Sequence, residues 1–152
     1  MPLNPDFIGR VYPPSAPYVV AREKVREFAS AIGDANPAYH DVDAARELGY
    51  ADLVVPPTFA IILSMRASSV VIHDPELGLD YSRVVHGEQR FSYDRPIIAG
   101  DELSVTTTIE SIRFAAGNDM ITTRGDIATL AGEHVATTHS LIVSRGPDAS
   151  DE

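Results

Sequence analysis

The segment that decides the fold is PPTFAIILSMRASSVVI, residues 56–72. Its apolar side chains point to every side of a helical axis, and Arg66 is its only charge. Pro57 suits the first position of such a helix, because the N–H that proline lacks has no partner there. A helix that is apolar on every side must be buried on every side. In a chain of 152 residues, which suits a single domain, the remaining segments therefore have to wrap around this helix.

The chain that follows supplies the wrapping. Residues 73–81 form a predicted loop, and from about residue 84 onward apolar and polar residues alternate as in strands with one buried face. The alternation slips after Ser111, which indicates a β-bulge, and AAGND (115–119) and AGE (131–133) predict hairpin turns. The clearest alternating series are Leu103, Val105, Thr107 and Ile109, and Val135, Thr137, His139, Leu141 and Val143. The predicted fold is α+β, a curled antiparallel sheet wrapped around a long central helix.

The segments before the helix complete the domain. Residues 1–18 are rich in proline and aromatic residues, which predicts an extended arm with a brief strand at Val19 and Val20. AREKVREFASAIGD (21–34) has the apolar spacing of an amphipathic helix that ends at Gly33. After a loop, Asp43 can cap a short helix closed by Gly49.

Composition excludes several classes of function. There is no cysteine, so disulfides, cysteine–zinc sites and cysteine nucleophiles are excluded. The net charge of −10 disfavours nucleic acid or an anionic membrane as the main partner. The N-terminus has no signal-peptide pattern, and no apolar run is long enough to span a membrane. We expect a soluble protein of the cytoplasm, with one domain over residues 1–145 and a polar, disordered tail over residues 146–152.

The loop GDANPAYHD, residues 33–41, gathers a carboxylate (Asp34), an amide (Asn36) and an imidazole (His40). A carboxylate and an imidazole that lie close together can act as a general acid–base pair. The same residues are also typical of an ordinary turn, because Asp and Asn side chains bond the backbone two residues on. From the residues alone both interpretations stay open.

Three segments together resemble one family. GDANPAYHD is similar to the motif Gly-Asp-x-Asn-Pro-x-His of the MaoC-like (R)-specific enoyl-thioester hydratases and dehydratases. RFSYDRPIIAGDEL (90–103) resembles that family's second signature, an aromatic strand followed by proline, Gly-Asp and an apolar residue. GYADLVVPPTF (49–59) lies where the family enters its central helix. The resemblance covers roughly residues 20–145, is nearest to the short single-hot-dog subunits of actinobacterial fatty-acid dehydratases, and implies a hot-dog fold.

The resemblance also implies an acid–base pair. In this family an aspartate and a histidine activate the water that adds to a trans-2-enoyl thioester, and in reverse they remove water from a (R)-3-hydroxyacyl thioester. The matching residues here are Asp34 and His40. The family places its histidine two residues after the proline, whereas here one more residue intervenes, so Tyr39 competes with His40 for that position.

The resemblance further implies a substrate site at the start of the central helix. There a backbone N–H polarises the thioester carbonyl, as an oxyanion hole must. Pro57 has no N–H to donate, which leaves Thr58 or Phe59 as the donor. The acyl chain needs an apolar tunnel beside the buried helix. The substrate-binding residues expected on this basis are Asn36, Pro57, Thr58 and Phe59.

The function implied is that of a hydro-lyase of fatty-acid metabolism, which acts on acyl thioesters of coenzyme A or acyl carrier protein without a cofactor. The alternative is a non-catalytic subunit that binds the acyl chain and pairs with a catalytic MaoC-like chain. A third possibility is a thioester-binding regulator or a thioesterase, since hot-dog folds host both. A small curled sheet has exposed edges. We therefore expect a homodimer, or a heterodimer with a MaoC-like subunit.

The remaining charged side chains and histidines predict no further site. The five histidines have no metal-ligand spacing. His73, His86, His134 and His139 are expected to be ordinary loop or strand residues. The basic residues Arg22, Lys24, Arg26 and Arg90 are most simply solvated, although one of them could hold a phosphate of the thioester carrier.

Overall fold

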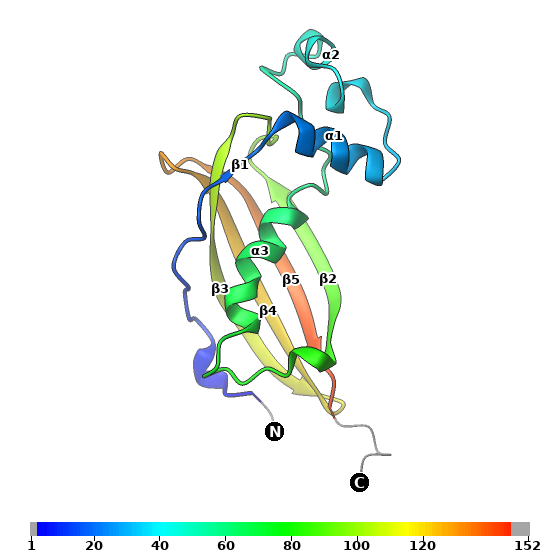
Figure 1. Cartoon of the computed structure of the whole chain (residues 1–152). Coiled ribbons are helices and arrows are strands. Elements are labelled where there is room, and N and C mark those ends of the chain that lie inside the picture. The colour runs from blue at the N-terminus through cyan, green and yellow to red at the C-terminus, as the bar shows by residue number, and fades with distance from the viewer. Residues whose placement is uncertain (1–2, 147–152) are drawn as a thin grey trace.

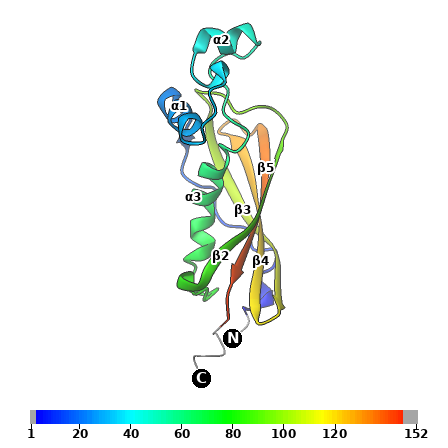
Figure 2. The same cartoon turned by 90° about the vertical axis from the view of Figure 1, so that its right-hand side faces the viewer.

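The computed structural model describes residues 3–146, so most of the predicted polar tail lies outside the described residues. One curled antiparallel sheet of five strands carries the fold, in the order β1-β3-β4-β5-β2. Helix α3, Ile61–Ile72, lies along its concave face (Figures 1 and 2). The strands are β1 (Tyr18–Val19), β2 (Val84–Tyr93), β3 (Glu102–Ala115), β4 (Asn118–Thr129) and β5 (His134–Ser144). The other helices are η1 (Pro5–Phe7), α1 (Arg22–Ala31), η2 (Pro37–Tyr39), α2 (Val42–Glu47) and η3 (Tyr81–Arg83).

The central helix begins later than the sequence predicts. Its first residue is Ile61 rather than Pro57. Pro56 precedes a second proline, which disfavours the helical conformation at Pro56, and Val55 is still tied to Ile97 by an N–H···O bond of 3.0 Å. The chain then makes tight turns, in which Phe59 N–H donates to Pro56 O over 2.9 Å, before regular helix starts.

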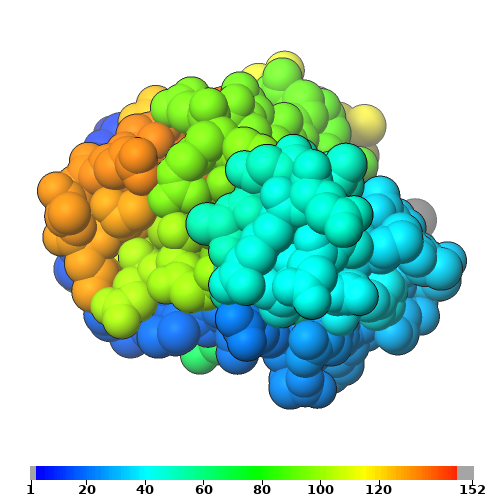
Figure 3. Space-filling view, turned by 90° about the horizontal axis from the view of Figure 1, so that it is seen from above, coloured from blue at the N-terminus to red at the C-terminus, as the bar shows by residue number. Residues whose placement is uncertain are grey.

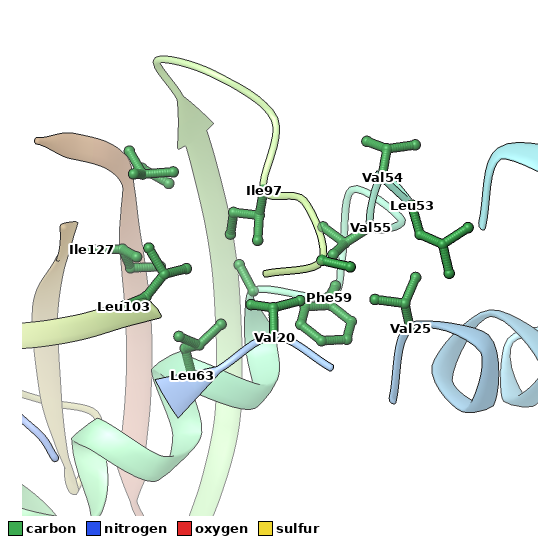
Figure 4. Packing of buried hydrophobic residues seen from close by; sticks show 14 of the residues in the cluster. Val20, Val25, Leu53, Val54, Val55, Phe59, Leu63, Ile97, Leu103 and Ile127 are labelled. Carbon is green, nitrogen blue, oxygen red and sulfur yellow. The ribbon is translucent and has the colours of Figure 1, made fainter. Parts of the chain in front are cut away.

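The sheet covers only one side of this helix. Leu63, Ala67 and Val71 are buried, and Figure 4 shows Leu63 packed among side chains of the sheet and of the adjoining segments. Away from the sheet Met65 is 63% exposed, and at the flank near the N-terminal arm Val70 is 48% exposed. The prediction of burial on every side is therefore wrong for a single chain, because five strands curl only part of the way around the helix.

The two hairpins of the sheet follow the sequence closely. The register of β3 against β4 shifts between Ile109 and Ser111, which confirms the predicted bulge. The first hairpin turns at Ala116 and Gly117, both with positive φ (50° and 77°), and the second turns at Gly132. These turns lie in the AAGND and AGE segments, as predicted.

The last strand presents an unexpected face to the helix. The pairing of β5 with β4 slips between Ile127 and Ala128, which leaves Val135 as an extra residue. Beyond this bulge Thr138, Ser140 and Ile142 are buried on the helix side, while the alternate residues from His139 to Val143 are half-buried on the other face. From Thr137 onward the predicted series therefore faces away from the helix, while Val135 stays buried in the core and the residues on the helix side are mostly polar.

The two edges of the sheet differ. The N-terminal arm covers the outer edge of β3 through hydrogen bonds from Tyr12 N to Thr107 O and from Ser15 N to Val105 O, each 2.9 Å. Aromatic side chains anchor the arm, since Phe7 and Tyr12 are buried. At the other edge, β2 pairs only with β5 within the described chain.

Helices α1 and α2 form a lobe beyond one end of the sheet (Figures 1 and 2). The predicted amphipathic helix is α1, with Val25 and Ala29 buried. The cap of α2 is Asp41 rather than Asp43, because its Oδ1 accepts from the N–H of Asp43 over 2.8 Å. Figure 3 looks down on this end, where the α2 segment (cyan) lies beside the segment that follows β2 (yellow-green). Among residues 3–146 no helix is long and apolar enough to cross a membrane.

Candidate active site

The carboxylate of Asp34 is engaged with its own loop. Its Oδ1 accepts from the N–H of Asn36 over 3.0 Å, which makes a turn of the Asx type. Asn36 repeats the pattern, and its Oδ1 accepts from Ala38 N–H over 3.1 Å to cap the short helix η2. Both side chains thus hold the loop in shape.

The histidine of the motif lies against the same loop. Nε2 of His40 is 2.9 Å from the main-chain oxygen of Asp34, not from its carboxylate. The carbonyl of His40 accepts from Arg26 Nε over 2.9 Å, which ties the loop to α1. The structure therefore brings Asp34 and His40 together through a backbone contact, and no described hydrogen bond joins their side chains.

A pocket of about 370 Å³ opens between the lobe and the segment after β2. Of the predicted site residues, Asn36, Tyr39 and Pro57 line it, and Asp34, His40, Thr58 and Phe59 do not. Phe59 instead lies in the core, edge-on to Phe28 with 5.4 Å between ring centroids. The pocket also contains two tyrosines that sequence reasoning missed, Tyr50 and Tyr93.

Of the two candidates for the histidine position of the motif, Tyr39 lines this pocket and His40 does not. Burial, helped by the nearby charge of Asp34, raises the pKa of Tyr39 above its ordinary value. A phenol whose pKa exceeds 10 keeps its proton at neutral pH and is a poor general base. In the pocket Tyr39 can donate a hydrogen bond, but it does not replace a histidine in removing a proton.

Of the two backbone donors expected at the entry to α3, one is free. The Tyr93 hydroxyl donates to the carbonyl of Pro57 and thereby braces the turn, and burial raises the pKa of Tyr93 to about 12. The N–H of Phe59 is already bonded to Pro56 O. The N–H of Thr58 has no partner among the described residues, so Thr58 is the better candidate for the predicted oxyanion donor.

The second signature shapes the wall of the pocket. Arg95, which lines the pocket, makes two hydrogen bonds with the carboxylate of Asp101, of 2.9 and 3.0 Å. Asp101 also accepts from the N–H of Ile98 over 2.9 Å. The bonds to Asp101, and a further one to Glu133, raise the pKa of Arg95. Asp101 thus serves here to hold the loop between β2 and β3.

The basic residues proposed as phosphate ligands are paired with carboxylates. Arg22 bonds Asp52 at 2.7 Å, and Lys24, Arg26 and Arg90 pair with Glu27, Glu23 and Glu88. None of the four is therefore preorganised for a phosphate. Within residues 3–146 there is no group of three or more acidic or histidine side chains that could hold a metal ion.

A second pocket, of about 280 Å³, lies between α3 and strands β2 and β5. It occupies the place expected of an acyl tunnel, and Met65, Ile72 and Ile142 give it apolar walls. Its floor is polar, with Ser64, Ser140 and Gln89. The serines of the helix, Ser64 and Ser68, are spaced by one turn in the sequence, which could have indicated this polar strip.

Comparisons with known proteins place the chain in a family. A family model described as "FAS1-like, dehydratase domain region" matches residues 6–138. A UPF0336 protein of Streptomyces avermitilis is 55% identical over 148 residues, which cover 97% of this chain and 99% of that protein.

Two solved structures extend the likeness. A MaoC-like dehydratase superposes with a TM-score of 0.85 at 38% identity, over 93% of this chain and 43% of the other. The truncated HadBC (3R-hydroxyacyl-ACP dehydratase) complex of Mycobacterium tuberculosis superposes with a TM-score of 0.81 at 32% identity, over 91% of this chain and 97% of the other. The predicted hot-dog fold is thereby confirmed, and the chain belongs to the FAS1-like dehydratases of the MaoC-like hot-dog family.

Proposed function

We propose that this chain is the acyl-chain-binding subunit of a two-chain dehydratase that acts on 3-hydroxyacyl thioesters of coenzyme A or acyl carrier protein. A catalytic MaoC-like partner supplies the acid–base pair. The observation that carries the proposal is the orientation of the motif loop. Tyr39, with a raised pKa, faces the pocket, while the His40 ring is bonded to the backbone of Asp34.

Two further observations support a second unit. Helix α3 carries exposed Met65 on its β2 side and exposed Val70 on its arm side, and β2 leaves one edge of the sheet unpaired in the described chain. The relative from Mycobacterium tuberculosis is described as a complex. The MaoC-like dehydratase is more than twice the length that this chain matches, which leaves room for a second unit of similar size.

A catalytic homodimer is the second candidate. It is favoured by the motif itself, since Asp34 and His40 lie in one loop, and by the unpartnered N–H of Thr58 at the start of the central helix. A rotation of the His40 ring away from the Asp34 carbonyl would be needed for it to act on substrate.

Hydration of trans-2-enoyl-CoA separates the two candidates. The purified chain is assayed alone, and then mixed with MaoC-like chains from the same organism that have histidine two residues after the motif proline. We expect no turnover alone and turnover in the mixture. Turnover by the chain alone that falls about 100-fold or more in His40→Ala would overturn the proposal in favour of the catalytic homodimer.

A further inference from the structure

The polar strip beneath the central helix lies apart from the Tyr39 pocket. Ser64 and Ser68 of α3 are buried, with 6% and 9% of their surface exposed, and they face Thr138 and Ser140 of β5, with 2% and 7% exposed. Gln89 of β2 completes the cluster. A hydrocarbon chain alone would make no use of such groups.

Hydrogen bonds connect the side chains of this cluster to Gln89. Thr138 Oγ1 donates to Ser64 Oγ over 3.3 Å, the hydroxyls of Ser64 and Ser140 lie 3.5 Å apart, and Ser140 Oγ donates to Gln89 Oε1 over 2.6 Å. A separation of 2.6 Å is typical of an O–H···O bond and short for N–H···O. The amide oxygen of Gln89 therefore accepts the hydrogen bond from Ser140. The amide nitrogen of Gln89, Nε2, is a donor and needs an acceptor of its own.

That nitrogen has nothing to donate to. Among the side chains of residues 3–146, Nε2 of Gln89 is the buried polar atom without a hydrogen-bond partner. Buried N–H groups are nearly always bonded in native proteins. Less than 1 Å² of Nε2 is exposed, so a ligand oxygen contacts it only after a small shift of the amide or of Met65, which both line the 280 Å³ pocket. A thioether side chain adapts readily to a ligand, and the terminal torsion of glutamine is broad.

We propose that this pocket binds the distal part of an acyl chain that carries an accepting oxygen, a hydroxyl or a ketone, and that Gln89 Nε2 donates a hydrogen bond to it. The inference rests on the proposed function, which places the acyl chain beside α3. Met65, Ile72 and Ile142 pack against the methylene groups. A saturated chain in the same place leaves the amide N–H without an acceptor, so the site discriminates against it.

The neighbouring Ser68 supplies a matched control. Its hydroxyl also lines the pocket, but it already donates to the main-chain oxygen of Met65 over 3.1 Å. Removal of the Ser68 hydroxyl should therefore leave the preference for an oxygen-bearing acyl chain unchanged. Ser140 differs, because it holds the Gln89 amide in its orientation, and is therefore a positioning residue.

The test compares the affinity of saturated acyl-CoA with that of hydroxy and keto positional isomers of equal length, over a range of chain lengths. Calorimetry is performed on the full chain and on its complex with the catalytic partner. We expect one isomer to bind about tenfold tighter than the saturated chain, the effect of one good hydrogen bond. Gln89→Met should abolish this preference but keep affinity for the saturated chain, Ser140→Ala should reduce it, and Ser68→Ala should preserve it.

Three results would overturn the inference. In the first, the parent protein binds all isomers equally. In the second, Gln89→Met retains the preference. In the third, a crystal structure of the complex shows a water or a partner side chain on Nε2. If the protein binds no acyl-CoA at all, alone or in the complex, the proposed function is refuted as well. If it binds acyl-CoA but does not distinguish the isomers, only the inference about Gln89 fails. Melting temperatures verify folding, and Gln89→Leu replaces Gln89→Met if that variant does not fold.

Discussion

In the motif loop, the two residues expected to form an acid–base pair bond to the backbone of the loop instead. Asp34 caps Asn36, and the His40 ring contacts the Asp34 carbonyl. In the proposed two-chain enzyme, Asp34→Asn and His40→Ala in this chain should therefore change kcat by less than about threefold. The corresponding substitutions in the catalytic partner should cost about 100-fold or more, the scale of a general acid or base. Steady-state assays of the four complexes check this. Equal large losses from either chain would contradict it.

Tyr12 and Asp74 join the N-terminal arm to the end of the helix. The Tyr12 hydroxyl donates to Asp74 Oδ2 over 2.8 Å, and this bond, helped by Arg10, lowers the pKa of Asp74 below its ordinary 3.8. Hydrogen bonds to charged groups contribute about 1.5–3 kcal/mol, so Tyr12→Phe should lower the free energy of unfolding by that amount at neutral pH.

The pH dependence of this bond has a definite sign. Because the folded pKa of Asp74 is depressed, its contribution is complete above 3.8 and is lost as the pH falls through the lower folded value. The difference between Tyr12→Phe and the parent should therefore shrink below that pH in urea titrations. Tyr81→Phe is the control, since Tyr81 is 63% exposed and should shift stability by less than about 0.5 kcal/mol. A difference that grows in acid would refute the assignment.

Sequence reasoning found the site loop but not the direction of its side chains. Asn36 and Pro37 fix a short helix, and this helix turns Tyr39 toward the pocket, while the His40 ring contacts the main-chain oxygen of Asp34. The motif has one more residue between Pro37 and His40 than the family pattern has. The hydrophobic periodicity of the sequence does not show which of Tyr39 and His40 then faces the pocket. The polar floor of the second pocket could not be predicted from the sequence either, because Gln89 and Ser140 are far apart in the chain and meet only through strand pairing.

At the scale of elements, substitutions in the core can test the position at which α3 begins. Ala60 caps the helix and is fully buried among the side chains shown in Figure 4. A ring at this position overpacks the core, so Ala60→Phe should cost about 1–3 kcal/mol or prevent folding. Met65→Phe, on the exposed side of the same helix, should change the stability of the isolated chain by less than about 0.5 kcal/mol. Chemical denaturation measures both, and similar losses would show that the helix packs differently.

The elements that were predicted well are those with local signals. The amphipathic spacing of α1 and the glycines of the two hairpins sufficed to place them. The face of β5 was not predictable, because the bulge at Val135 reverses the alternation and is defined only by the pairing with β4. The start of α3 was misplaced for a similar reason, since the tie between Val55 and Ile97 is a contact distant in sequence.

At the scale of the whole molecule, one side of helix α3, where Met65 and Val70 are exposed beside Arg66 and Ser69, and one strand edge remain open. The arm closes the β3 edge, while the outer edge of β2 and the exposed side of α3 stay uncovered in the described chain. We therefore expect no stable monomer in sedimentation at micromolar concentration once the partner is present. Met65→Glu places a charge on the open face, where burial against a second unit is costly, and should weaken association about tenfold or more.

A matched substitution elsewhere on the surface distinguishes loss of a specific contact at Met65 from a general effect of added charge. Leu130 is also apolar and exposed, at 54%, but it lies at the turn between β4 and β5. Leu130→Glu should therefore leave association unchanged. Both variants should melt as the parent chain does, because neither side chain is buried within it. If the parent sediments as a monomer with every MaoC-like partner tested, or if both variants weaken association equally, the open face of α3 is not where the second unit binds.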